Sequence, residues 1–505
     1  MIFPFSIMSS SPRQQASLLR KHFRLLEVVP GLFSWSLILF PFWGSFFFPI
    51  AVAYYVLAFD VYWLYRSVST ALLAVFAHFR IQAALSFDWM GELSLFPDWR
   101  RVHHLVIIPT FKEPLHTLRR TLEGLRRQTF PKRQIDVVVS FEEREGETAY
   151  KKAEHLRDVF DGVFSSFLIT FHPKLSGEVA GKSSNTSWAA KFAKRELVDR
   201  RGFDINYLTV TSEDADAVLH PHYLAALTYA FLDHPRRYRR IWQAAIVFYN
   251  NIWRVPAPIR VLATIWSVVQ TSLLIRQDRL INFSTYSTSM RLAHEIGYWD
   301  VDVIPEDYRL FFKAYFHFKG GVETESLFLP VYADAAESTS YWKTMVNQYE
   351  QVKRWAWGVS DDPYIIRHWL TAKRISFWDK TFRVLGVLED HFLWPVNWFA
   401  ITLGALLPPL INPNFSRTIL GKTLPQVSSF ILTLSLISLV VILFIDARQR
   451  PPREQGISLL RRLFQPFEFI LLPVVGFFFS ALPGIDAHTR LMLGRYIEYR
   501  VTEKV

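Results

Sequence analysis

The sequence predicts two kinds of structure in one chain, a water-exposed α/β domain and an α-helical transmembrane domain. Half of the 505 residues are apolar and 44 of them are Phe, more than one soluble core requires and typical of membrane spans with aromatic boundaries. Charged residues still make up 20% of the chain, which is enough to cover a water-exposed domain. Long apolar segments lie near both ends, whereas short apolar runs alternate with charged helical stretches between them. We therefore expect membrane helices on both sides of a central α/β domain.

The first long apolar segment covers residues 28–64, where Asp60 is the only charged side chain. As one helix this segment would extend about 55 Å, whereas the hydrocarbon core of a bilayer is about 30 Å thick. Helix-breaking residues interrupt it at Pro41, Gly44 and Pro49. We expect two transmembrane helices within residues 28–66, near 28–45 and 47–66, joined by a tight hairpin. A buried hairpin of a large soluble protein is the alternative.

The positive charges indicate how the chain is oriented in the membrane. The net charge is +12, and the N-terminal segment 1–27 and the loop after residue 445 are both rich in Lys and Arg. Since such segments remain in the cytoplasm, both predict that the central domain is cytosolic and that the protein is a multi-pass protein of the plasma (inner) membrane, in contact with the lipid bilayer. The Lys and Arg do not form a nucleic-acid site, because the one dense run, Arg236–Arg240, is short.

After an expected interfacial helix at residues 67–101, the pattern changes to α/β alternation over residues 102–345. The apolar runs LVIIPT, IDVVVSF and YLTV are separated by charged helical stretches, which predicts a mostly parallel sheet covered by helices. Ligands of such sheets bind beyond the carboxyl ends of the strands. The polar residues that directly follow each strand are therefore the candidate site residues.

The C-terminal part is expected to be helical and largely apolar. Residues 346–385 predict interface helices, and residues 386–483 predict transmembrane helices. The apolar segments in the second region lie near 391–411, 427–445 and 467–482. Pro466, Pro473, Gly476 and Pro483 predict that the third segment is kinked or re-entrant. Residues 484–505 are expected to be a separate C-terminal segment after these helices. The chain has no cysteine, which excludes disulfides, thiolate metal sites and a cysteine nucleophile.

Carboxylates follow two of the expected strands. The first strand ends at Thr110 and is followed by Glu113, which can accept hydrogen bonds from a base or ribose. Asp214 and Asp216 follow the strand YLTV, and their repulsion can be offset by Mg²⁺ or Mn²⁺ held together with substrate phosphates. A surface Glu and a solvated acidic loop are the alternatives.

Three further patterns stand between and after these strands. Lys182 lies in a Gly-Lys-Ser-Ser-Asn loop, where small residues allow close approach to a phosphate and one Lys supplies a positive charge. Glu306 and Asp307 precede an expected helix, a position that also suits a helix cap. The third pattern is Gln351, Arg354 and Trp355, whose amide, guanidinium and indole ring can lie on one side of a helical turn. An amphipathic interface helix is the alternative there.

In this order, and between membrane hairpins, the five patterns closely resemble glycosyltransferase family 2, specifically its processive, cellulose-synthase-like branch. The resemblance covers residues 100–360 and implies a GT-A fold, with a Rossmann-like cytosolic catalytic domain. It implies a set of donor-binding residues made of Thr110, Glu113, Lys182, Asp214, Gln351 and Arg354. It also implies that Asp216 holds the metal, that Asp307 is the general base, and that Glu306 and Trp355 bind the acceptor.

The C-terminal sequence YRVTEK resembles the gating loop of cellulose synthases, which implies that Thr502 and Lys504 contact the donor as a lid. Two positions depart from the family pattern. Ser140 stands where an Asp is usual after the second strand, so that Glu142 is the expected base-binding carboxylate, and Pro305 replaces the usual Thr.

The expected function is inverting transfer of a sugar from a nucleotide-sugar, with UDP as the expected nucleotide, to the growing end of a polysaccharide. A non-processive transferase that makes a glycolipid or a polyprenyl-phosphate sugar is one alternative, and an inactive glycan-export scaffold is another. A glycan or lipid is the expected acceptor, and nucleic acid is not an expected partner. The sequence identifies neither the sugar nor any protein partner.

Overall fold

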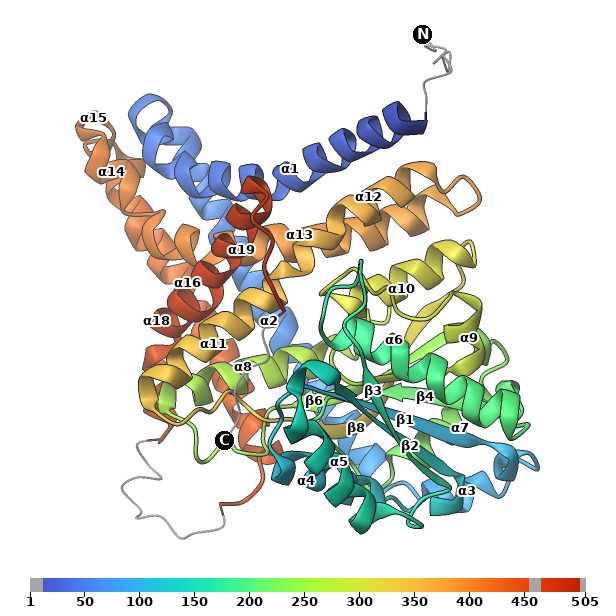
Figure 1. Cartoon of the computed structure of the whole chain (residues 1–505). Helices are drawn as coiled ribbons and strands as arrows, with labels where there is room; N and C mark the ends of the chain where they lie inside the picture. Colours follow the sequence, from blue (N-terminus) through green and yellow to red (C-terminus); the bar gives the residue numbers. More distant parts are fainter. Residues whose placement is uncertain (1–11, 454–464, 500–505) are drawn as a thin grey trace.

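The structure of the chain is a computed structural model that describes residues 12–453 and 465–499. It has two parts: a sheet covered by helices, at the lower right of Figure 1, and a group of long helices at the upper left. The N-terminal and C-terminal helices lie together in the second part, although the α/β domain separates them in sequence. The predicted order, membrane-type helices on both sides of an α/β domain, is therefore observed.

One mixed sheet forms the centre of the α/β domain, with strand order β3-β2-β1-β4-β7-β6-β8-β5. Its strands are β1 His103–Thr110, β2 Ile135–Glu142, β3 Ser166–His172, β4 Leu208–Ser212, β5 Val218–Leu219, β6 Arg240–Val247, β7 Tyr286–Ser289 and β8 Glu323–Tyr332. The first four are parallel, as predicted. The sheet is mixed beyond them, because β7 pairs antiparallel with both β4 and β6.

Helices cover both faces of this sheet because its central strands are apolar on both sides. Along β1, Val106 and Ile108 pack into one apolar cluster, whereas Leu105 and Ile107 pack into another. This alternation follows from the two-residue period of a strand. The first cluster includes residues of α4 (Leu115–Arg126), α5 (Glu147–Phe160) and α7 (Tyr223–Asp233). The second includes residues of α6 (Lys182–Ala193), α9 (Met290–Glu295) and α10 (Glu306–His317).

The N-terminal hairpin consists of α1 (Pro12–Phe47) and α2 (Pro49–Ser86), and Phe48 separates them as the predicted break requires. The structure differs from the expected boundary at residue 67, because α2 continues to Ser86. With 38 residues α2 is about 57 Å long, so it extends well beyond a bilayer core. Its second half packs against the α/β domain, where Ala84 contacts Ala226 and Leu329. Only the short helix α3 (Trp89–Leu93) and a turn, η1 (Trp99–Arg101), follow before β1.

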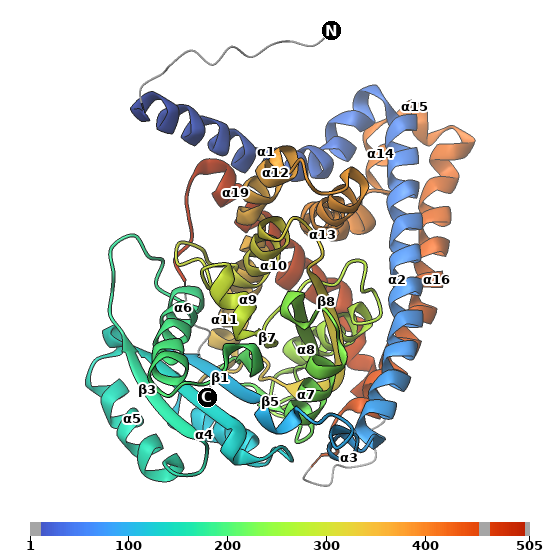
Figure 2. The ribbon, with the colours of Figure 1, turned by 90° about the vertical axis from the view of Figure 1, so that its right-hand side faces the viewer.

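The C-terminal half continues as helices, with α2 and α16 side by side in Figure 2. These helices are α8 Ala257–Leu273, α11 Tyr341–Ala356, α12 Asp362–Thr371, α13 Phe377–Leu403, α14 Leu407–Ile411, α15 Pro413–Ser416, α16 Ile419–Gln449, α18 Leu472–Gly476 and α19 Leu482–Leu493. Shorter 3-10 and π segments are η2 Lys132–Gln134, η3 Glu143–Glu145, η4 Lys194–Arg200, η5 Ile205–Tyr207, η6 Arg237–Arg239, η7 Trp357–Asp361, η8 Gln465–Leu471 and η9 Phe477–Ala481.

In the described part of the chain, four helical segments are long and apolar enough to cross a membrane: Arg24–Phe47, Pro49–Ser86, Ile419–Gln449 and Phe467–Leu493. The predicted span 391–411 is not one of them, because α13 ends at Leu403 and carries polar side chains such as Glu389 and Asn397. The last segment is irregular, as its prolines predicted, since the 3-10 segment η8 and the π segment η9 interrupt it. After Leu493 the chain returns to the α/β domain, where Tyr499 lies close to Arg354.

Candidate active site

The ends of β1, β2 and β4 face one cavity of about 530 Å³, together with the N-termini of α6 and α10 and one side of α11. Every predicted site residue in the described part of the chain lines this cavity: Thr110, Glu113, Glu142, Lys182, Asp214, Asp216, Glu306, Asp307, Gln351, Arg354 and Trp355. The remaining two, Thr502 and Lys504, lie outside the described residues. Segments separated by more than 200 positions in sequence therefore meet at one place, as the carboxyl edge of a parallel sheet favours.

Lys182 lies at the centre of the charged part of this cavity. It is the first residue of α6, and its Nζ lies 2.8 Å from Asp214 Oδ1, 2.8 Å from Glu306 Oε1 and 3.9 Å from Asp307 Oδ1. Burial disfavours the charged form of Lys182, but the three carboxylates outweigh burial and raise its pKa well above the usual value. Lys182 is therefore a permanent cation that holds three acidic side chains together.

Ser284 connects the same groups from the loop before β7. Its Oγ donates a hydrogen bond to Asp214 Oδ2 at 2.6 Å, and its backbone N–H donates to Asp307 Oδ2 at 3.0 Å. Its backbone carbonyl accepts a hydrogen bond from Lys182 Nζ at 2.6 Å. Ser284 has a φ of 58°, a left-handed conformation that costs a non-glycine residue about 1–3 kcal/mol. The three hydrogen bonds explain why this strained conformation is retained.

Asp307 combines burial with access to the cavity. It is the second residue of α10, where the positive end of the helix dipole favours a carboxylate. Burial, followed by the charge of neighbouring Glu306, nevertheless raises its pKa well above the usual value, whereas Lys182 lowers it. A carboxylate with a raised pKa is a better proton acceptor than an exposed one. Asp307 is therefore suited to general base chemistry.

Asp216 occupies a second, separate position in the cavity. Its Oδ2 accepts a hydrogen bond from the backbone N–H of Asp334 at 3.0 Å, and Asn250 Nδ2 donates to its carbonyl at 3.1 Å. The guanidinium of Arg120 donates to both carboxylate oxygens of Asp334 at 2.7 Å. The position of Asp216 is thus fixed from two loops, those after β6 and β8.

The edge of the cavity near β2 contains the residues expected to hold the base. Glu142 pairs with Arg144, whose guanidinium lies 3.8 Å above the ring of Phe111. Ser140, which replaces the usual Asp, exchanges two hydrogen bonds with Asn185: its Oγ donates to Asn185 Oδ1 at 2.5 Å, and Asn185 Nδ2 donates to its carbonyl at 2.8 Å. Ser140 therefore attaches the first turn of α6, a segment that the sequence predicted to be a loop, to the sheet.

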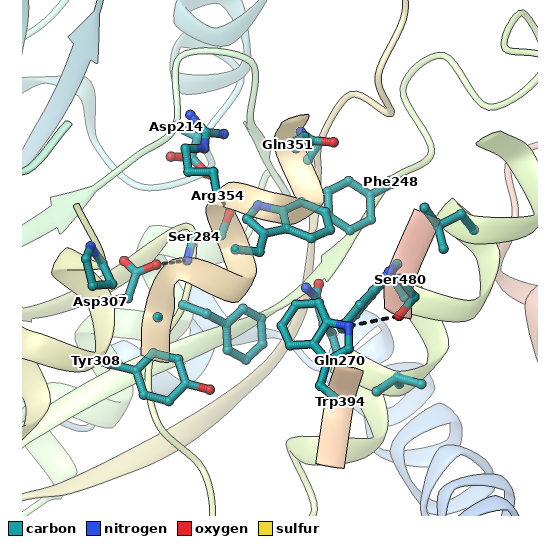
Figure 3. A pocket seen from close by; sticks show the side chains of 18 of the residues that line it. Asp214, Phe248, Gln270, Ser284, Asp307, Tyr308, Gln351, Arg354, Trp394 and Ser480 are labelled. Atoms are coloured by element: carbon teal, nitrogen blue, oxygen red, sulfur yellow. Dashed lines mark hydrogen bonds between the residues drawn. The ribbon is translucent and has the colours of Figure 1, made fainter. Parts of the chain in front are cut away.

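On the opposite side, α11 presents Gln351 and Arg354 (Figure 3). Trp355 of the same helix also lines the cavity. The Trp355 ring stacks with Phe248 at 5.9 Å between centroids and meets the edge of Trp266 at 5.6 Å. Arg354 lies 5.0 Å from the centre of the Tyr499 ring. A Cβ atom on Gly181 would lie only 2.6 Å from that same ring, so the small residue before Lys182 makes room for the C-terminal segment.

Sequence reasoning did not select Ser284, Asp334 or Phe248, although all three line the cavity. Ser284 lies in the loop between α8 and β7, whose residues form no recognisable motif. Asp334 and Phe248 lie within two residues of the ends of β8 and β6, so the rule that ligands bind beyond strand ends could have found them. The sequence could not show that these two strands belong to the same sheet as β4.

Residues 210–445 match a family model described as glycosyl transferase family group 2. The match begins in β4 and includes Asp214, Asp307 and the α11 residues. The chain contains a glycosyltransferase domain. This result confirms the predicted enzyme class, a glycosyltransferase, and the mixed sheet covered by helices confirms the predicted α/β fold class.

Two solved structures are similar to this chain at low identity. A mannosyltransferase from Pyrobaculum calidifontis, in complex with GDP-Man and Mn²⁺, is 15% identical with a TM-score of 0.41, over 76% of this chain and 99% of that one. TarS 1–349 of S. aureus, in complex with UDP-GlcNAc, is 14% identical with a TM-score of 0.35, over 71% and 95%. Scores this low carry no argument about donor or metal. The comparison with curated proteins gives no match.

Proposed function

We propose that this glycosyltransferase is a membrane-embedded, inverting enzyme that extends a glycan from a nucleotide-sugar, with Asp307 as the general base. One observation carries the proposal: the buried cation Lys182 and the partly exposed carboxylate of Asp307, whose pKa is raised, line the same cavity as an aromatic wall. This wall consists of Trp355, Trp266 and Trp394. The cavity is also lined by α2, α8, α13 and α18, so that its acceptor side reaches the apolar helices. We propose that these helices lie in the plasma (inner) membrane, with the α/β domain in the cytosol.

The donor side contains the residues that a nucleoside diphosphate requires. Lys182 and Arg354 supply positive charge for the diphosphate, and Glu113 and Glu142 line the part of the cavity beside β1 and β2 where the nucleoside would lie. With Tyr499 close to Arg354, the residues after it, including Thr502 and Lys504, are proposed to cover the bound donor.

Asp216 is proposed to hold Mg²⁺ or Mn²⁺. In the described residues no group of three or more acidic or His side chains gathers in a way that would enclose a metal by protein alone. One or two carboxylates completed by substrate phosphates fit such ions, and Asp214 and Asp216 offer that donor set. When bound, the ion would neutralise charge that develops on the departing diphosphate.

In the proposed reaction, an acceptor hydroxyl opposite the leaving group attacks the anomeric carbon. The bond between the acceptor oxygen and this carbon forms as the bond from the carbon to the diphosphate oxygen breaks. The hydroxyl proton passes to Asp307, and the electron pair of the broken bond leaves with the nucleoside diphosphate. A single displacement of this kind inverts the anomeric configuration.

The aromatic wall supports a glycan as the acceptor. Trp355, Trp266 and Trp394 follow one another along the cavity, with centroid distances of 5.6 and 5.2 Å between neighbours. Rings of this type offer flat apolar faces on which sugar rings can stack. Successive additions to one glycan, as the Gln-x-x-Arg-Trp motif favours, are therefore part of the proposal. A single-sugar glycolipid product would instead favour the non-processive alternative.

The decisive test is a donor panel. Purified full-length protein is incubated with UDP- and GDP-sugars and Mg²⁺ or Mn²⁺, and the released nucleoside diphosphate is measured. One donor is expected to be consumed, with a product of inverted anomeric configuration. Absence of release with every donor and both metals would contradict the proposal.

Asp216→Ala tests the proposed metal site. The substitution should remove both the stimulation by Mg²⁺ or Mn²⁺ and at least 100-fold of the transfer activity, about 2.7 kcal/mol of transition-state stabilisation. Asp233→Ala, at the exposed end of α7, is the matched control and should keep both. The measurement is the transfer rate as a function of metal concentration. Unchanged metal dependence in Asp216→Ala would rule out Asp216 as the ligand.

A further inference from the structure

The acceptor side of the cavity follows one face of α13. The residues of this helix that line it run from Glu389 to Trp398. At 1.5 Å per residue they cover about 14 Å of the helix axis. The wall that α13 offers to a bound glycan is therefore short.

Trp398 is held firmly at the end of this lined face. A Cβ atom added to Gly476 would lie 2.1 Å from Cε2 of Trp398, so the indole rests directly against the backbone of α18. On the other side, the ring of Trp63 from α2 lies 5.5 Å from the Trp398 ring, edge to face. Three separate elements, α2, α13 and α18, thus meet around this one indole.

Beyond Trp398, the residues that follow α13 enter a packed cluster. Ala405, two residues after the end of α13 at Leu403, packs with Val52, Val56 and other buried residues of α2, α15 and α16. A Cβ atom on the intervening Gly404 would lie 2.8 Å from Cγ2 of Val56. Contacts this close leave no room for a sugar ring between α2 and α13 at this level.

We propose that Trp398 closes the far end of the acceptor cavity and thereby limits the length of the glycan. This inference rests on the proposed function. Each added sugar moves the earlier ones along the aromatic wall toward Trp398, and elongation stops when the first sugar of the chain reaches that indole. The product is then an oligosaccharide of limited length rather than a long polymer.

The test compares the product ladders of the wild type and Trp398→Ala, made from the donor that the panel identifies. The wild type should give a short ladder with a sharp upper limit. Trp398→Ala should extend that limit by one or more sugars, while the initial rate of nucleoside diphosphate release changes less than about threefold. Trp378→Ala is the matched control: the same substitution on the same helix, but at a Trp that is 65% exposed, outside the cavity. It should give the wild-type ladder.

Gly476→Ala provides a second variant in case Trp398→Ala does not fold. The added methyl group would overlap the indole of Trp398 in its present position, so this side chain must move and the upper limit of the ladder should change. Its control is Gly484→Ala, whose Cβ atom would meet Cβ of Pro395 at 3.2 Å, a tight contact with α13 at another residue than Trp398. This variant shows whether a tight contact with α13 alone alters the products, and it should leave the ladder unchanged. A long polymer from the wild type, or donor turnover with an unchanged ladder in the folded variants, would overturn the length limit alone. No turnover with any donor would overturn the proposed function, and the length limit with it.

Discussion

Asp307→Asn is expected to reduce sugar transfer by about 10²–10⁴-fold, the usual contribution of a general base. The amide keeps the size of the carboxylate but cannot accept the proton of the acceptor hydroxyl. Donor binding should change little, because the nearest cation, Lys182, lies 2.8 Å from Asp214 and from Glu306 but 3.9 Å from Asp307. The measurements are the transfer rate and the dissociation constant of the nucleoside diphosphate.

Asp302→Asn serves as the control for this experiment. Asp302 lies in the same segment before α10, but it is exposed and outside the cavity. Its variant should transfer sugar at the wild-type rate. Wild-type transfer by Asp307→Asn would exclude Asp307 as the base, and an equal loss of donor binding would assign it to the donor instead.

The sequence predicted the site better than it predicted how the site is held together. Strand-end residues such as Glu113 and Asp216 could be selected because strands and their carboxyl ends are visible as local patterns. Ser284 could not, since its importance arises from contacts with Lys182, Asp214 and Asp307, which are distant in sequence. Local periodicity carries no information about such contacts.

For the fold too, features set by nearby residues were predicted, whereas features set by contacts between distant residues were not. The apolar runs of β1 and β2 predicted buried parallel strands, and both strands are almost completely buried. The antiparallel position of β7 between β4 and β6 was not predicted, because its four residues are mostly small and polar. The length of α2 was underestimated, since the helix continues to Ser86 and its second half packs against the α/β domain.

Lys182 links the two halves of the proposed chemistry, because it contacts a donor-side carboxylate, Asp214, and the region of the base, Asp307. A cation in this position can attract the donor diphosphate while it lowers the pKa of Asp307. Replacing Lys182 should therefore affect both donor binding and the pH dependence of transfer, whereas replacing Asp307 should affect transfer alone.

Lys182→Met is expected to weaken donor binding and to move the acid limb of the pH profile. Loss of one charge-assisted contact to the diphosphate costs about 1.5–3 kcal/mol, or about 10- to 150-fold in kcat/KM. Asp307 must be ionised to accept a proton, so activity falls as the pH drops through its pKa. Burial and Glu306 already raise that pKa, and Lys182 lowers it. Removing Lys182 should raise the pKa of Asp307 further, and the acid limb should move to higher pH.

The profile of kcat/KM against pH distinguishes this effect from a general loss of structure, because a structural defect lowers activity without displacing the acid limb. Lys191→Met, on the exposed side of the same helix α6, is the matched control and should keep both the rate and the profile. An acid limb at unchanged pH in Lys182→Met would mean that Lys182 does not tune Asp307. An acid limb displaced to lower pH would mean that a different group accepts the proton.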